Sequence, residues 1–128
     1  MDAKVRVIME CRYDILDLTS ELEIEIEDAV KLYTLFFSEM KTEIEELKSS
    51  FSKSNLKMMQ NITHNIKGVS ANLRIDDVSY EAKKICDMLK ENRFDGSYKH
   101  IELLENIIDQ AYYDIREFFI CNGFEIER

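Results

Sequence analysis

The chain contains no proline and only three glycines in 128 residues, and this scarcity limits the folds that it can adopt. Tight turns, hairpins and long loops depend on these two residues, because proline fixes φ and glycine tolerates positive φ. A small all-β barrel would need many such turns, so the composition predicts a few long helices joined by short connections. The hydrophobic content of 45% suffices for one buried core, and a chain of this length is expected to form one domain.

Charge, cysteine and histidine usage exclude several classes of function. The formal net charge of −9 argues against nucleic acid as the main partner, since phosphate binding needs a basic face. No segment approaches the length of a membrane-spanning helix, and the N-terminus lacks the apolar core of a signal peptide. Cys11, Cys86 and Cys121 show no paired spacing, and His64 and His100 show no metal-binding spacing. These patterns favour a cytoplasmic protein with reduced thiols and no metal site.

Apolar residues recur at steps of three and four along most of the chain, which is the spacing of amphipathic helices. Four such stretches run from Leu22 to Leu47, Met58 to Leu73, Val78 to Leu89 and Ile101 to Phe119. Ser20 and Glu23 have capping-box spacing and predict that the first helix begins after Ser20. The apolar alternation over residues 22–26 leaves a start near Glu27 open.

Polar residues mark the ends of the other helices. The expected caps are Ser52 or Ser54 for the second helix, Asp76-Asp77 for the third, Asn92 at its end, and Asn122-Gly123 at the end of the fourth. The sequence therefore predicts an all-α fold, an antiparallel four-helix bundle with its core over about residues 25–122. Residues 1–18 are expected to form an extension or an accessory helix, within a single domain over residues 1–128.

His64 is predicted to lie on the solvent face of the second helix. On a helical wheel, Ile62, Ile66 and Leu73 fall opposite His64, so a core formed by these residues places the imidazole outside. The residues within about 60° of His64 on this wheel are Lys57, Gln60, Asn61, Lys67, Gly68 and Ala71. A lone surface histidine usually has no role, but the combination of types on this face is unusual.

Gly68 is unexpected because it lies in the middle of a predicted helix, where glycine costs about 1 kcal/mol relative to alanine. Removal of the Cβ on a solvent face lets another molecule approach the neighbouring imidazole. Lys67 could neutralise the charge of a phosphoryl group attached to His64.

Residues 64–73, with the sequence HNIKGVSANL, resemble the H-x-x-K-G-x-S-x-x-L motif of histidine-containing phosphotransfer (HPt) domains in bacterial-type two-component phosphorelays. The resemblance extends over about residues 25–120 and includes the acidic, aromatic-rich helix upstream. It implies that His64 is the phosphoacceptor, that Lys67 stabilises the phosphoryl charge and that Gly68 gives access.

The resemblance also implies a docking surface around His64. The expected contacts are Lys57, Gln60, Asn61, Ala71, Asn72 and Arg74, and Arg74 stands where many members of the family have a second glycine. Relatives often hold the histidine with a polar side chain of the next helix. The corresponding region here contains Lys83, Cys86 and Asp87, for which an ordinary surface or boundary role is favoured over contact with the histidine.

The function implied by the resemblance is that of a phosphocarrier. A neutral imidazole is a nucleophile near neutral pH, and the chain has no phosphate-binding loop, so it is not expected to be an ATP-dependent kinase. The expected partners are response-regulator receiver domains and a sensor histidine kinase, with Mg²⁺ supplied by the receiver and the chain itself a monomer without a stably bound cofactor. Two alternatives stay open: a helical adaptor without phosphochemistry, and a module that docks receivers without transferring phosphate.

Overall fold

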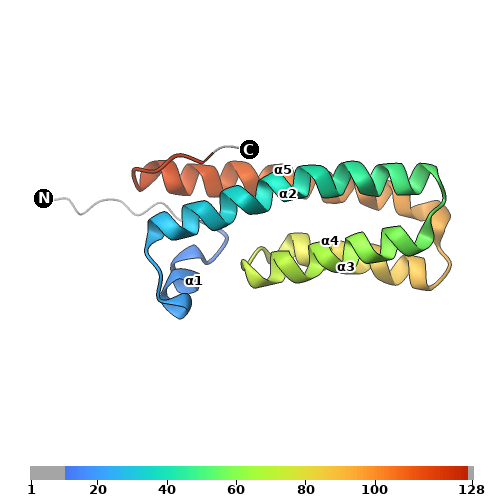
Figure 1. The fold of residues 1–128 in the computed structure, drawn as a ribbon, viewed down its shortest axis with the longest axis horizontal. Helices are drawn as coiled ribbons and strands as arrows, with labels where there is room; N and C mark the ends of the chain where they lie inside the picture. The colour runs from blue at the N-terminus through green and yellow to red at the C-terminus, as the bar shows by residue number, and fades with distance from the viewer. Residues whose placement is uncertain (1–10, 127–128) are drawn as a thin grey trace, which may run out of the picture.

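The computed structural model describes residues 11–126, and these residues form helices without a strand (Figure 1). The helices are α1 (Ile15–Leu22), α2 (Ile26–Ser52), α3 (Leu56–Asn72), α4 (Asp76–Lys90), the short 3₁₀ helix η2 (Phe94–Gly96) and α5 (Ser97–Cys121). The all-α prediction is confirmed.

Helices α2 to α5 form an antiparallel bundle whose members differ in length. The long α2 and α5 lie together, and the shorter α3 and α4 pack beside them (Figure 1). At 1.5 Å per residue, α2 is about 40 Å long and α3 about 25 Å, so α3 and α4 leave one end of α2 and α5 uncovered. Helix α1 lies at this end and buries Ile15 and Leu18.

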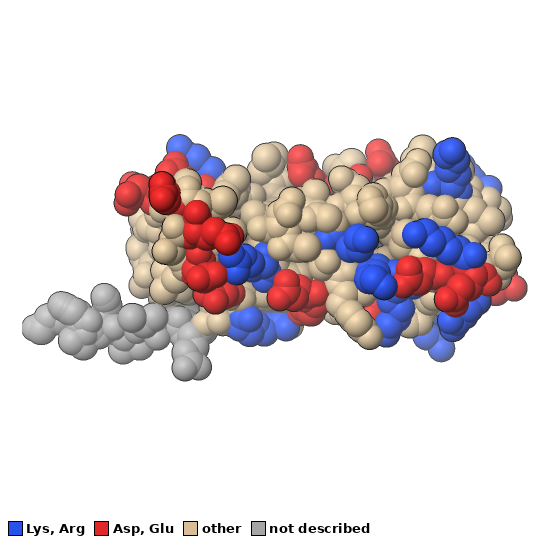
Figure 2. Space-filling view, turned by 90° about the horizontal axis from the view of Figure 1, so that it is seen from below, with Lys and Arg blue, Asp and Glu red and all other residues tan. Residues whose placement is uncertain are grey.

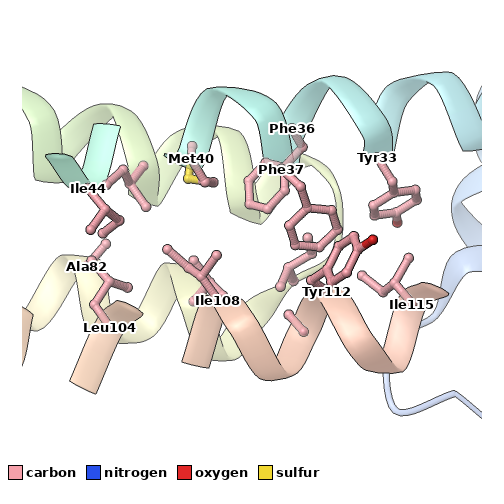
Figure 3. Packing of buried hydrophobic residues seen from close by; sticks show 14 of the residues in the cluster. Tyr33, Phe36, Phe37, Met40, Ile44, Ala82, Leu104, Ile108, Tyr112 and Ile115 are labelled. Atoms are coloured by element: carbon pink, nitrogen blue, oxygen red, sulfur yellow. The ribbon is translucent and has the colours of Figure 1, made fainter. Parts of the chain in front are cut away.

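Aromatic side chains fill the core between α2 and α5. Phe37 of α2 and Tyr112 of α5 point toward each other in Figure 3, and their ring centroids are 5.3 Å apart in an edge-on arrangement. Tyr33 lies one turn before Phe37 in α2 and packs against Phe119 with ring centroids 5.8 Å apart. Such offset and edge-on pairs are the preferred geometry of aromatic rings, so this end of the core is firmly packed.

The predicted cap at Ser20 is wrong, because Ser20 lies inside α1. Helix α1 begins after Asp14, whose carboxylate accepts a backbone hydrogen bond in the first turn. Glu23 then adopts a positive φ of 57°, and α2 begins after Glu25, with the Asp28 carboxylate accepting the Glu25 backbone N–H at 3.3 Å. The alternative start near residue 27 therefore matches α2. Of the predicted accessory helix, residues 1–10 lie outside the described residues.

The predicted cap of α3 at Ser52 or Ser54 is also wrong. Helix α2 continues through Ser52, whose hydroxyl donates to a carbonyl one turn earlier in the same helix. Ser54 has a positive φ of 54°, and the cap is Asn55, whose side-chain oxygen accepts the backbone N–H of Met58 at 3.1 Å. The cap of α3 lies later than predicted because α2 continues through the serine-rich segment, where Phe51 packs against Phe94 and Tyr98.

The remaining helix ends lie close to their predicted positions. Asp76 and Asp77 occupy the first turn of α4 after the cap residue Ile75, where carboxylates favour the positive end of the helix dipole. Helix α5 ends at the predicted residues, with Asn122 as its cap and Gly123 following at a φ of 87°.

Candidate functional site

Helix α3 presents His64 to solvent. Met59, Ile62 and Ile66 of the same helix are buried, and His64 is exposed on the opposite face, as the wheel predicts. Within residues 11–126, no side chain or carbonyl forms a hydrogen bond with its ring nitrogens. The imidazole is therefore accessible to a molecule that approaches from outside the bundle.

Gly68 lies one turn after His64 on the same exposed face. A Cβ at this position would have no atom of the described chain within 4 Å, apart from the backbone of its own turn. Packing inside residues 11–126 therefore gives no reason for a glycine here. The space that the missing Cβ leaves open is space beside the imidazole.

Lys67 is half-buried, and its backbone is fixed by the next helix. The hydroxyl of Ser79 in α4 donates to the Lys67 carbonyl at 2.9 Å, and the hydroxyl of Ser70 lies 3.3 Å from the same oxygen. Helices α3 and α4 also share the most extensive contact of any two helices in the described chain. The turn between His64 and Gly68 is thus held rigidly against α4.

Two buried hydroxyl residues of α3 were missed by the sequence reasoning, which considered only apolar side chains. Thr63 and Ser70 are fully buried, and each hydroxyl donates to the carbonyl four residues earlier, in Met59 and Ile66. Their seven-residue spacing, which places both on one side of a helix, was the signal that could have identified them.

The candidate residues of α4 form an ion pair with each other and not with His64. The Lys83 ammonium lies 2.9 Å from the Asp87 carboxylate. This hydrogen bond, together with the charges of Lys90 and Lys67, lowers the pKa of Asp87 below its ordinary value. Cys86 is buried, with its sulfur 4.0 Å from the carbonyl oxygen of Gln60.

The residues predicted to contact a partner surround His64 on the surface, with one difference. The exposed members are Lys57, Asn61, Ala71 and Asn72, and Gln60 is half-buried. Arg74 instead turns toward α1, where its guanidinium donates to Asp17 at 2.7 Å and Glu21 at 2.6 Å.

The backbone at Arg74 has a conformation that favours glycine. Arg74 follows the end of α3 with a φ of 64°, a left-handed conformation that glycine adopts without a steric cost. The two carboxylates of α1 give this arginine a role that a glycine could not have.

A groove of about 500 Å³ lies between α2 and α3, on the other side of His64 from α4. Its lining residues are Ser38, Glu39, Thr42, Glu43, Asn65 and Val69. The Asn65 amide donates to the Glu43 carboxylate at 2.8 Å across this groove. The sequence reasoning did not identify this bond, because it depends on the register between two helices.

Within residues 11–126, no group of three or more His, Cys, Asp or Glu side chains could hold a metal ion. None of the helices in this range has the length and apolar character needed to cross a membrane.

Comparison with known proteins identifies the family. Residues 31–112, more than half of the chain, match a family model described as Hpt domain. The match includes α3 and α4 completely, whereas α1 lies outside it. No curated protein and no solved structure was found to match the chain. The match confirms the resemblance of the motif at residues 64–73, and the chain belongs to the Hpt domain family.

Proposed function

We propose that this Hpt domain is a phosphocarrier, in which His64 accepts a phosphoryl group from the aspartyl-phosphate of one receiver domain and passes it to the aspartate of another. The observation that carries this proposal is the exposed imidazole beside an open helical glycine. Gly68 stabilises nothing in the described chain, since a Cβ there would meet no neighbouring atom. Close approach of a partner explains both features.

The chemistry balances with His64 as the nucleophile. The lone pair of its unprotonated ring nitrogen forms the N–P bond, while the P–O bond to the receiver aspartate breaks and its electrons leave with the carboxylate. The second ring nitrogen keeps its proton. In the second transfer an aspartate oxygen attacks the phosphorus, and the N–P bond breaks to return the neutral imidazole.

Lys67 and Gly68 support this transfer in different ways. The Lys67 ammonium is three residues from His64 on the helix, where it would offset the negative charge of the transferred oxygens. Because the Ser79 hydroxyl binds the Lys67 carbonyl, the backbone from which the lysine side chain extends is held in place. Gly68 leaves room for the partner backbone to reach the imidazole.

The partner supplies what this chain lacks. The proposed receiver provides the carboxylates that bind Mg²⁺, and a sensor histidine kinase in the cytoplasm supplies the phosphoryl group upstream. Lys57, Gln60, Asn61, Ala71 and Asn72 form a small polar surface around the imidazole. A contact of this kind suits a transient complex, which a carrier needs in order to exchange partners.

The test is transfer of labelled phosphate from a phosphorylated receiver in the presence of Mg²⁺. The wild type should acquire a label that is labile in acid and stable in alkali, and His64→Gln should acquire none. His100→Gln is the matched control, because the His100 ring is already paired with Glu81 at 2.8 Å and should not accept phosphate. Label on His64→Gln would refute the assignment, and an unlabelled wild type with every receiver offered would favour the adaptor.

A further inference from the structure

The charge of this protein is distributed unevenly around His64. The chain has a net charge of −9, yet α3 contains Lys57 and Lys67 and no acidic residue, unlike the other α-helices of the described chain. Figure 2 shows the molecule from the side of α3 and α4. Acidic residues gather toward the α1 end, whereas Lys and Arg lie over the middle and the opposite end, with acidic residues between them. The helix that contains His64 therefore has positive side chains and no carboxylate of its own.

The register between α3 and α4 brings further lysines to this face. Ser79 contacts the carbonyl of Lys67, and Cys86 contacts the carbonyl of Gln60, so the two helices pair in antiparallel order. In this register Lys83, three residues before Cys86, lies level with Thr63, three residues after Gln60. Thr63 immediately precedes His64.

Asp87 lies among several of these lysines. The Asp87 carboxylate accepts a hydrogen bond from Lys83 at 2.9 Å and experiences the charges of Lys90 and Lys67. We call Lys57, Lys67, Lys83 and Lys90 the lysine seam, which follows the boundary of α3 and α4. With Asp87 among them, the seam has a local charge of about +3 in an acidic protein.

The opposite side of His64 has the reverse character. The groove between α2 and α3 is lined by Glu39 and Glu43 and by no lysine or arginine. An acidic surface that approaches the imidazole is therefore attracted by the lysines at the boundary of α3 and α4 and repelled by Glu39 and Glu43 of α2. At close range these two fields act on the orientation of the complex as well as on the encounter rate.

We propose that the lysine seam is the docking surface for an acidic protein surface and directs the receiver to His64 across α4. The inference rests on the proposed function, since it names the side from which the phosphoryl donor arrives. A receiver with an acidic surface beside its phosphorylated aspartate would have the charge that this seam fits. A nucleic acid fits less well, because the acidic remainder of the surface would repel a long polyanion.

The test compares two variants with the same change in net charge. Lys83→Glu/Lys90→Glu reverses the seam outside the transfer chemistry, and Lys31→Glu/Lys41→Glu reverses two exposed lysines of α2. The second-order rate constant for phosphoryl transfer should fall about tenfold in the seam variant at about 20 mM salt, and less than about twofold in the control. At about 500 mM salt the two should converge, because screening removes long-range attraction.

Asp87→Asn provides the opposite change, since it removes the negative charge from the seam. Transfer at low salt should become about threefold faster. Equal slowing of the seam and control variants would mean that only net charge matters, and would overturn the inference, as would an unchanged rate in the seam variant.

Binding of the unphosphorylated receiver, followed by titration, separates this inference from the proposed function. Weaker binding in the seam variant alone supports the seam even where no phosphoryl group moves, and equal binding in all variants overturns it. Retention of duplex DNA by the wild type and not by the seam variant would also overturn it, in favour of a nucleic acid.

Discussion

Replacing Gly68 should stabilise the fold and impair transfer, a combination that separates a functional glycine from a structural one. An exposed glycine inside a helix costs about 1 kcal/mol relative to alanine, and a Cβ at Gly68 would meet no atom within 4 Å. Gly68→Ala should therefore raise the free energy of unfolding by about 1 kcal/mol, or the melting temperature by about 4 °C for a chain of this size. Urea unfolding followed by far-ultraviolet circular dichroism measures this gain.

The functional half of the prediction uses a longer side chain at the same position. Gly68→Gln should retain most of the helical gain, because glutamine is a good helix former, while its side chain occupies the space beside the imidazole. Transfer from a phosphorylated receiver should slow about tenfold or more, which corresponds to about 1.4 kcal/mol of transition-state free energy.

Gly123 provides the matched control for this experiment. It follows α5 with a φ of 87°, so Gly123→Ala should destabilise the protein by about 1 kcal/mol. A loss of stability in Gly68→Ala would show that α3 needs a glycine for its own conformation. Transfer by Gly68→Gln at the wild-type rate would refute the role of open access.

Three further predictions concern the supports of the site. Tyr33→Phe should lower the free energy of unfolding by about 1–2 kcal/mol in urea, since the phenol donates to the Leu73 carbonyl at 2.7 Å from inside the core. Burial raises the pKa of Tyr33, so the native state keeps a proton that the unfolded chain releases above about pH 10. The free energy of unfolding of the wild type should therefore fall with rising pH above this value. That of the phenylalanine variant should fall less steeply. Arg74→Met should lower the melting temperature at low salt, with a smaller difference in high salt, because two ion pairs to α1 are lost. Asn55→Ala should cost about 1 kcal/mol in the same urea assay through loss of the α3 cap.

The outward direction of His64 could be predicted because it depends on one helix alone. Once Ile62 and Ile66 are assigned to the core, the period of 3.6 residues fixes where His64 points, whatever the partner helices are. The same local reasoning located Gly68 beside it. Both residues are exposed in the structure.

The helix caps were less predictable, because many polar residues can satisfy a helix end and tertiary packing selects among them. Ser20 has suitable chemistry for a cap, yet it lies inside α1. That helix is needed to cover the end of α2 and α5, which extend beyond their shorter neighbours. Glu25 and Asp28 then provide the α2 terminus with carboxylates.

Contacts between distant segments were not accessible from the sequence. Arg74 pairs with Asp17, 57 residues earlier, and the grouping of Lys83 with Lys67 requires the register of α3 against α4. In the sequence these residues are ordinary surface charges. Their arrangement follows from helix packing, which periodicity within one helix does not determine.

Helix α3 also shows that the site depends on its neighbours for rigidity. The helix contains Gly68 and several residues of low helix propensity, among them Thr63 and Ser70, so an isolated peptide of this sequence would have little helical structure. It is held in place by its buried apolar side and by α4, whose Ser79 hydroxyl binds the α3 backbone beside the site. His64 and Gly68 make no packing contact that α3 needs, so an imidazole and a glycine can occur where a molecule from outside can reach them.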